Sequence, residues 1–236
     1  MHSDVAPSLI LLGATLAVLG YIEAGLVPLT IVGLSMVAAG LLAYWDEGSL
    51  EQVIVNLASA AWDNIAALVE SAGLTGKGIY LPSSLGNGEA AVLIPSTPVD
   101  NIGKLTIVGK PLAIYGPGLR GLLLSSPGSR AVAICRDAGA LASDLDSSLT
   151  GCIVNQLSLA RSIEVNETGG EVLVRLSGVR PINLYGDSIL RNSLGSTLAS
   201  IVASVVAEVT NRPVMVSEES ARGNSLIVRL RVVGGA

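Results

Sequence analysis

The chain has 236 residues, of which 50% are hydrophobic and 14% are charged, and its formal net charge is −5. Ordinary soluble proteins carry roughly 25% charged residues, so an apolar segment must account for the deficit. No Lys or Arg occurs between Met1 and Gly76, and from Lys77 onward the charges are nearly balanced. This distribution lacks the basic stripe of a nucleic-acid-binding protein and predicts no nucleic-acid partner.

Two apolar runs begin the chain, Val5 to Ile22 and Leu26 to Trp45, and neither contains a charge. Each has roughly the 17–25 residues that cross ~30 Å of hydrocarbon as a helix. Glu23-Ala24-Gly25 suits a turn between them. We predict a transmembrane helical hairpin in residues 1–47, with the lipid bilayer around residues 5–45. A signal peptide, a buried hairpin in a soluble core and a hairpin inside a polymeric assembly are the alternatives.

Orientation has to be predicted without the positive-inside rule, because no Lys or Arg lies close to the two runs. Moving a three-residue loop across the membrane is easier than moving the rest of the chain, which favours a cytoplasmic soluble domain. The sequon Asn166-Glu167-Thr168 is the opposing observation, since a glycan is added there only outside the cytoplasm.

Residues 48–236 are predicted to form a soluble α+β domain. Ser49 and Gln52 form a capping box for a helix that should end by Gly73. Apolar spacing predicts later helices over 139–160 and 188–209. Strands are predicted at Gly78–Leu81, Ala90–Ile94, Lys104–Val108, Leu112–Tyr115 and Ala131–Cys135, and hairpins at Ser162–Val165 with Glu171–Ser177 and at Val214–Glu218 with Ser225–Val233.

A helix followed by a hairpin recurs, which predicts αββ units at 139–177 and 188–233 and a looser one at 49–95, sharing one sheet. Alternation along the strands places Arg175, Arg229 and Arg231 on one face. They could bind an anion, but a solvated sheet face is the favoured interpretation.

The candidate chemical motifs fail in their context. Gly116-Pro117-Gly118-Leu119-Arg120-Gly121 matches a dinucleotide fingerprint, but Pro127-Gly128 leaves no room for the helix that would hold a pyrophosphate. Arg120 and Arg136 are left as candidate residues for a small-anion ligand. Cys135 and Cys152 are interpreted as buried free thiols, with a single disulfide as the alternative. Since His2 is the only histidine, we expect no metal site.

Three resemblances are partial. Gly186-Asp187-Ser188-Ile189 resembles the nucleophile block of GDSL-type esterases, yet no histidine is present to activate Ser188, and a helix cap is favoured. The absence of Phe and the excess of Arg over Lys resemble uncharacterised two-span membrane proteins of archaea. The segment 190–233 resembles the end of the small-molecule-binding domains named after vinyl reductases, which implies ligand sensing.

These observations predict a protein that is not an enzyme and has no cofactor. The leading interpretation is a membrane-anchored, scaffold-like interaction or assembly module that forms a homo-oligomer and binds an unidentified protein partner. Small residues on the last predicted helix favour close packing with another chain: Ser196, Ser200, Ala203, Ser204 and Ala207. The alternatives are a membrane-tethered sensor of a small molecule or lipid and an envelope or filament structural component.

Overall fold

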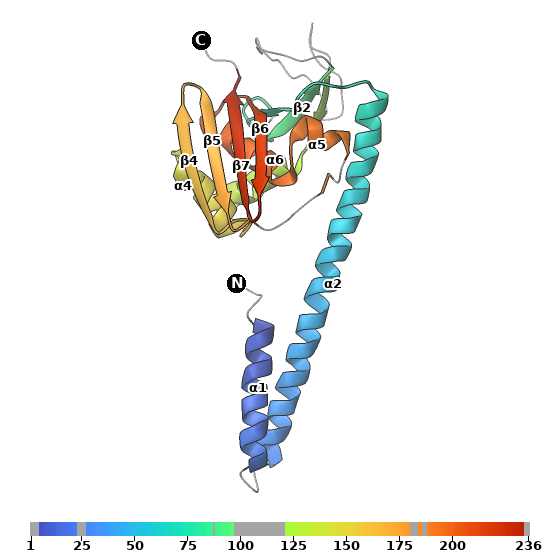
Figure 1. Ribbon diagram of the computed structural model, residues 1–236, viewed down its shortest axis with the longest axis vertical. Helices are drawn as coiled ribbons and strands as arrows, with labels where there is room; N and C mark the ends of the chain where they lie inside the picture. The colour runs from blue at the N-terminus through green and yellow to red at the C-terminus, as the bar shows by residue number, and fades with distance from the viewer. Residues whose placement is uncertain are drawn as a thin grey trace. The chain divides into compact units, whose positions relative to one another are not determined.

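The structure is a computed structural model that describes residues 5–22, 27–86, 88–96, 121–179, 184–185 and 188–233, with side chains described there except at 5–6, 27 and 42–52. Its elements (Figure 1) are α1 (Val5–Ile22), α2 (Val27–Ser71), β1 (Ile79–Leu81), β2 (Ala91–Pro95), β3 (Gly121–Leu124), α3 (Pro127–Asp137), α4 (Leu145–Leu149), the π-helical turn η1 (Thr150–Gln156), β4 (Ser162–Thr168), β5 (Glu171–Ser177), α5 (Ile189–Leu194), α6 (Thr197–Thr210), β6 (Val214–Arg222) and β7 (Ser225–Val232). The described chain is therefore α+β, as predicted.

Contacts divide the chain into two compact units, Met1–Ala58 and Ser59–Ala236. The predicted boundary between residues 47 and 48 lies inside α2, which runs from the first unit into the second. The helix start predicted at Ser49 is wrong, because α2 is already helical there. The residues that form a capping box can also occupy interior helix positions when the preceding turn is helical.

In the first unit, α1 packs on the first part of α2 through glycines. A Cβ on Gly13 would lie 2.7 Å from the carbonyl oxygen of Gly33 and 2.8 Å from the amide nitrogen of Val37. A Cβ on Gly20 would lie 2.7 Å from the amide nitrogen of Thr30. No side chain fits at such distances, so glycine is what allows these two helix backbones to approach.

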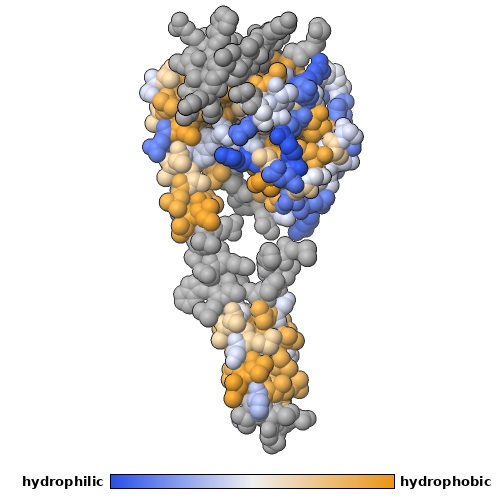
Figure 2. All heavy atoms as spheres, turned by 180° about the vertical axis from the view of Figure 1, so that it is seen from behind, coloured by the Kyte–Doolittle hydropathy of each residue, from blue (hydrophilic) through white to orange (hydrophobic). Residues whose placement is uncertain are grey.

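The surfaces of α1 and of this part of α2 that face away from their contact are apolar. Leu11 and Ile22 are 70% and 71% exposed, and Ile31 is 59% exposed. The hydroxyls of Thr15 and Ser35 each donate at 2.8 Å to a backbone carbonyl of their own helix. Figure 2 shows hydrophobic residues over most of the described surface of this helix pair. The described part of this helix pair therefore has apolar sides, and its Thr15 and Ser35 hydroxyls are satisfied within their own helices.

In the second unit, the described strands form one antiparallel sheet in the order β3-β2-β1-β6-β7-β5-β4. The hairpins β1–β2, β4–β5 and β6–β7 each follow a helical segment in the chain. That residues 49–95, 139–177 and 188–233 are repeated αββ units stays a prediction. The β4–β5 turn needs glycine, because Gly169 and Gly170 have φ of +57° and +89°.

The main core lies between this sheet and helices α3, α4 and α6, which cover one of its faces (Figure 1). Alternate residues of β5 and β7 are buried there: Val172, Val174, Leu176, Leu226, Val228 and Leu230. Arg175, Arg229 and Arg231 are exposed, which confirms the predicted alternation. On β1 and β2 a second cluster, including Ile79 and Leu93, is buried on the opposite face.

The strand predicted at Ala131–Cys135 is wrong, since this segment belongs to helix α3. Ser129 donates its amide N–H to the Ser126 hydroxyl at 3.2 Å, and Ser126 donates its own N–H to the Ser129 hydroxyl at 3.0 Å. With Pro127 in the first turn, these reciprocal bonds start a helix. Five apolar residues alone do not distinguish a buried strand from a helix.

The two long helices predicted for this domain are both interrupted. Residues 188–209 form α5 and α6, separated at Gly195, whose φ is +77°, with Ser196 capping α6. Residues 139–160 contain only α4 and η1, because Asp144 caps a helix that begins later than predicted. In both segments the apolar spacing continues through the break, so periodicity alone does not reveal it.

Two predicted strands, Lys104–Val108 and Leu112–Tyr115, lie outside the described residues. Strand β3 was not predicted, although it pairs with β2 along the edge of the sheet. Its sequence, Gly-Leu-Leu-Leu, is short and lacks β-branched residues, so it gives little strand signal.

Candidate functional site

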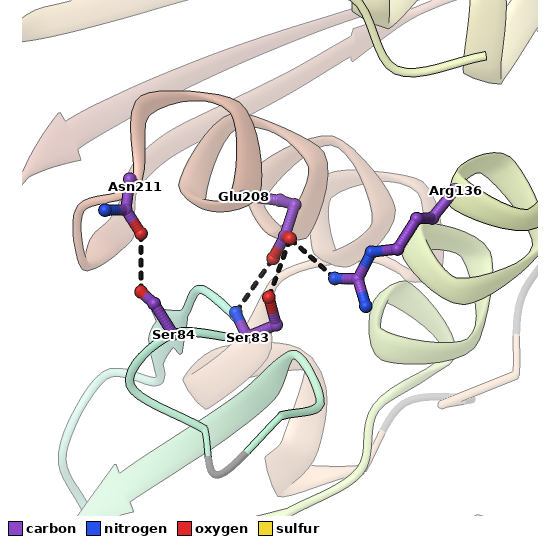
Figure 3. Close-up of polar contacts among 5 residues, drawn as sticks. All are labelled: Ser83, Ser84, Arg136, Glu208 and Asn211. Carbon is purple, nitrogen blue, oxygen red and sulfur yellow. Dashed lines mark hydrogen bonds and ion pairs between the residues drawn. The ribbon is translucent and has the colours of Figure 1, made fainter. Parts of the chain in front are cut away.

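The most connected polar group on the domain is the carboxylate of Glu208 on α6 (Figure 3). It accepts hydrogen bonds from the amide N–H and the hydroxyl of Ser83, both at 2.8 Å. Arg136 of α3 forms an ion pair with it at 2.5 Å. Beside this group, the Ser84 hydroxyl donates to the side-chain oxygen of Asn211 at 2.5 Å. The four contacts join the turn after β1 to α3 and to the end of α6.

Burial and hydrogen bonding act in opposite directions on Glu208. Burial alone would raise the pKa of its carboxyl group, because the charged form loses hydration. The hydrogen bonds from Ser83 and the charge of Arg136 outweigh burial, so the pKa of Glu208 lies below its ordinary value. The group is therefore ionised at neutral pH with its oxygens engaged, which suits a structural clamp better than a general base.

Arg136, one of the two predicted anion-binding residues, is thus engaged by Glu208, although its side chain is 43% exposed. The small cavity beside it is lined by Glu89, Ser129 and Arg130, among others, and has a volume of about 40 Å³. Pockets that hold small molecules usually have about 300–1,000 Å³, so this cavity is too small for a metabolite. Arg120, the other predicted residue, lies outside the described residues.

The arginines on the outer face of the sheet are partly neutralised by acidic neighbours. Arg175 lies 3.6 Å from Glu164, and Arg229 lies 3.5 Å from Glu218. All four side chains are about half exposed or more. A mixed-charge, hydrated surface agrees with the interpretation of this face as a solvated one.

Ser188, the residue of the esterase-like block, occupies the N-cap position of α5. Its hydroxyl donates to the backbone carbonyl of Tyr185 at 2.5 Å and makes no capping bond to the helix. The Tyr185 hydroxyl donates to Ser200, and its ring meets the Trp62 ring edge-on at 5.0 Å. Burial raises the pKa of Tyr185 well above its ordinary range, so its hydroxyl stays protonated.

Cys135 of α3 and Cys152 of η1 form a disulfide with their Cα atoms 5.3 Å apart. Both are fully buried, as predicted, but the favoured interpretation as free thiols is wrong. The error arises because the two residues are predicted on a strand and a helix, whereas both belong to helical segments that pack together. A spacing of 17 residues by itself predicts neither state.

The small residues of α6 do not form an external surface. Ser200, Ala203, Ser204 and Ala207 are buried inside the domain. A Cβ on Gly128 of α3 would collide with Ser204 and with the backbone of Ser200, so α3 occupies this face of α6. These residues pack closely within the chain. They are therefore not free to contact another chain, contrary to the expectation from the sequence.

An exposed face of α2 supplies a different surface for association. We define the α2 seam as Ile54, Leu57, Ala61, Asn64 and Leu68, which follow one another at alternating intervals of three and four residues. Ile54, Leu57 and Leu68 are 57%, 68% and 47% exposed. Alternating intervals of three and four residues place side chains in one line along a coiled-coil helix.

Other residues of α2 fix the end of this helix in the second unit. Trp62, Ile65, Ala66 and Val69 of α2 pack on the main core, and Val69 is fully buried. The α2 seam is made of other residues of the same helix, and all five are exposed. The end of α2 is therefore held by the domain while its seam stays open.

A family comparison covers both parts of the chain. The model of a domain of unknown function, DUF7982, matches residues 9–232. The chain belongs to the DUF7982 family. The match begins within α1 and includes α2 and the whole sheet, so the apolar helix pair and the α+β domain are parts of one family unit. No curated protein and no solved structure matches the chain.

Proposed function

We propose that this DUF7982 protein is a membrane-anchored, non-enzymatic assembly module that self-associates through the α2 seam. The observation that carries the proposal is the exposed line of Ile54, Leu57, Ala61, Asn64 and Leu68 on α2. Exposed apolar side chains in water cost free energy, and burying them against a partner recovers about 25 cal/mol per Å² of apolar area.

Membrane attachment is supported by the helices of the first unit. Among the described residues, Val53–Ser71 and Ile189–Thr210 are the two helices that are long and apolar enough for a span, and Pro7–Ile22 and Pro28–Leu41 are shorter apolar helices. Ile189–Thr210 is 72% buried, as a core helix is, whereas α1 has large apolar side chains exposed along its length. A helix that is apolar all round suits lipid when no protein covers it. At 1.5 Å per residue, the 18 residues of α1 extend about 27 Å, close to the hydrocarbon thickness.

A second copy of the same chain is the partner that best fits the seam. Anchoring gives every copy the same orientation, so the α2 helices of two neighbours run parallel. A parallel pair sets each seam residue against its own counterpart. Asn64 then meets Asn64, a polar pair within an otherwise apolar seam, and in the single chain its amide donates to the Ala60 carbonyl of its own helix at 3.1 Å.

Confinement to a membrane strengthens a short contact of this kind. The α2 seam extends over 15 residues, or about 22 Å of helix, which is marginal for a coiled coil in solution. Restricting two chains to one plane raises their effective concentration without any new contact. The positions that flank the seam, Ala58, Ala60, Ile65 and Ala67, are uncharged, so no like charges face each other at these positions.

The non-enzymatic part of the proposal is supported by the polar groups that the structure describes. Glu208 is committed to Ser83 and Arg136, and the Ser188 hydroxyl is directed to a backbone carbonyl. Among the described residues, no group of three or more His, Cys, Asp or Glu is placed to hold a metal ion. These contacts favour structural roles for the groups that a reaction would need.

The mass of the full chain reconstituted in lipid nanodiscs or mild detergent tests the proposal. We expect dimers or larger assemblies that dissociate on dilution, and we expect Leu57→Asp to shift the population to monomers. Asn56→Asp is the matched control, because it places the same charge one residue away, off the seam, at an exposed position. A wild-type chain that is monomeric at all concentrations, or a Leu57→Asp variant that assembles like wild type, would contradict the proposal.

A further inference from the structure

The sequon Asn166-Glu167-Thr168 lies at the exposed end of β4, an edge strand of the sheet. All three residues are exposed. They adjoin the Gly169–Gly170 turn, where the chain leaves the strand. No other Asn in the chain is followed, two residues later, by Ser or Thr. The sequon is therefore unique in this chain and accessible in the folded domain.

The strand geometry brings the two key side chains of the sequon together. Residues i and i+2 of a strand project from the same face, so Asn166 and Thr168 are neighbours there. The Thr168 hydroxyl donates to the side-chain carbonyl oxygen of Asn166 at 3.3 Å. The Asn166 amide nitrogen, the atom to which a glycan would be attached, takes no part in this bond.

The Cys135–Cys152 disulfide is a second, independent observation. These are the only cysteines of the chain, and both are bridged inside the core. Structural disulfides form and persist in oxidising compartments and are rare where glutathione keeps thiols reduced. The domain with the sequon therefore also has a disulfide of the kind that forms outside the cytoplasm. This observation favours the opposite side of the membrane from the one that loop length favours.

We propose that Asn166 is an N-glycosylation site on a domain displayed outside the cytoplasm. The donor is an oligosaccharide joined through a phosphate ester to a lipid carrier. The Asn166 amide nitrogen forms a bond to the anomeric carbon of the first sugar as the bond from that carbon to the phosphate oxygen breaks. The lipid phosphate leaves with the electron pair, and one proton of the amide passes to a base of the transferase.

A glycan at this position would also protect the edge of the sheet. An unpaired edge strand can pair with the edge of another chain, and natural proteins block such edges with charges or bulky groups. Glu164 and Glu167 already place charge on β4. A glycan on Asn166 adds a large hydrated group at its end, so contacts between copies are directed away from this edge of the sheet.

The test is to translate the full chain in the presence of endoplasmic reticulum microsomes and follow its gel mobility before and after endoglycosidase treatment. We expect one slower band, reversed by the enzyme, that is lost in Asn166→Gln and in Thr168→Ala and retained in Thr168→Ser. A variant with Asn166→Gln, Ser220→Asn and Arg222→Thr moves the sequon to the exposed end of β6, next to the β6–β7 turn, and reports the side of the membrane separately.

Each outcome is decisive. A shift for wild type that Asn166→Gln abolishes, together with a shift for the moved sequon, supports the proposal. A moved sequon that is modified while wild type is not would place the domain outside but overturn Asn166 as the site. Modification of neither chain, with both inserted into the membrane, would place the domain in the cytoplasm and overturn the proposal. The mass measurements on Leu57→Asp test self-association independently of all three.

Discussion

Replacing Glu208 with alanine removes the acceptor of the network in Figure 3. The resulting loss in the free energy of unfolding has two parts. The first is the pair of hydrogen bonds from Ser83, both 2.8 Å long, to a carboxylate whose side chain is only 14% exposed. The second is the ion pair with Arg136, whose side chain is 43% exposed. The structure predicts that the first part is larger than the second.

Hydrogen bonds to charged groups contribute about 1.5–3 kcal/mol each, and an N–H left unpaired by the mutation adds a desolvation cost. Half-exposed ion pairs contribute about 0–1 kcal/mol because water screens them. We therefore expect Glu208→Ala to lower the free energy of unfolding by about 3 kcal/mol and Arg136→Ala to lower it by less than about 1 kcal/mol. For a domain of this size, 1 kcal/mol corresponds to roughly 2–4 °C in melting temperature.

Thermal unfolding of the full chain in mild detergent, followed by near-ultraviolet circular dichroism, measures this difference. Trp62 and Tyr185 are in contact in the core and report its loss. We expect melting temperatures about 6–12 °C lower for Glu208→Ala and at most about 4 °C lower for Arg136→Ala. Equal losses for the two variants, or none for Glu208→Ala, would refute the assignment of the stabilisation to the Ser83 hydrogen bonds.

The lowered pKa of Glu208 gives a stability contribution that is complete above the unfolded-state pKa and lost as pH falls through the folded-state pKa. Acid should therefore lower the melting temperature of wild type more than that of Glu208→Gln. Equal acid sensitivity of the two proteins would count against a stabilising role of the Glu208 carboxylate. Replacing both Cys135 and Cys152 with alanine opens a link across 17 residues, and urea unfolding should show a loss of about 3 kcal/mol. An unchanged midpoint would show that the bridge is not formed in the protein. Gly128→Ala pushes a methyl group into Ser204, and the same urea titration should show a loss of about 1–3 kcal/mol, whereas a neutral result would mean that α3 can move aside.

The parts of the fold that the sequence predicts well are those with strong local signals. The β4–β5 and β6–β7 hairpins have alternating strands and glycine-containing turns, and both were predicted near their observed positions. The αL cap at Asn211, two residues after the predicted end of this helix, has the same local origin. For these elements, neighbouring residues alone determine the conformation.

The errors concern one unusual local signal and several features that depend on distant contacts. Ala131–Cys135 is helical because of a serine capping box whose Ser/Ser pair is not the usual signature. The disulfide and the burial of the small α6 residues depend on α3 packing against α6 and η1, which no spacing in the sequence encodes. Glu208 was missed as the centre of the polar network for the same reason, because Ser83 is 125 residues away along the chain.

The α2 seam could have been found from the sequence, since its three- and four-residue intervals lie within a single predicted helix. What the sequence could not supply is which of the apolar faces of α2 the domain covers. Trp62, Ala66 and Val69 are covered and Leu57 and Leu68 are exposed, although all are apolar and lie within a few turns. That distinction is a property of the tertiary structure.

Cysteine cross-linking in native membranes tests self-association through α2 most directly. Single cysteines would be placed on the seam, at Leu57 and Asn64, and one residue before each, at Asn56 and Asp63, in the full chain, where Cys135 and Cys152 are already bridged. With a mild oxidant, the account predicts strong disulfide-linked dimers from positions 57 and 64 and weak ones from 56 and 63. Equal cross-linking at all four positions, or none at 57 and 64, would contradict it.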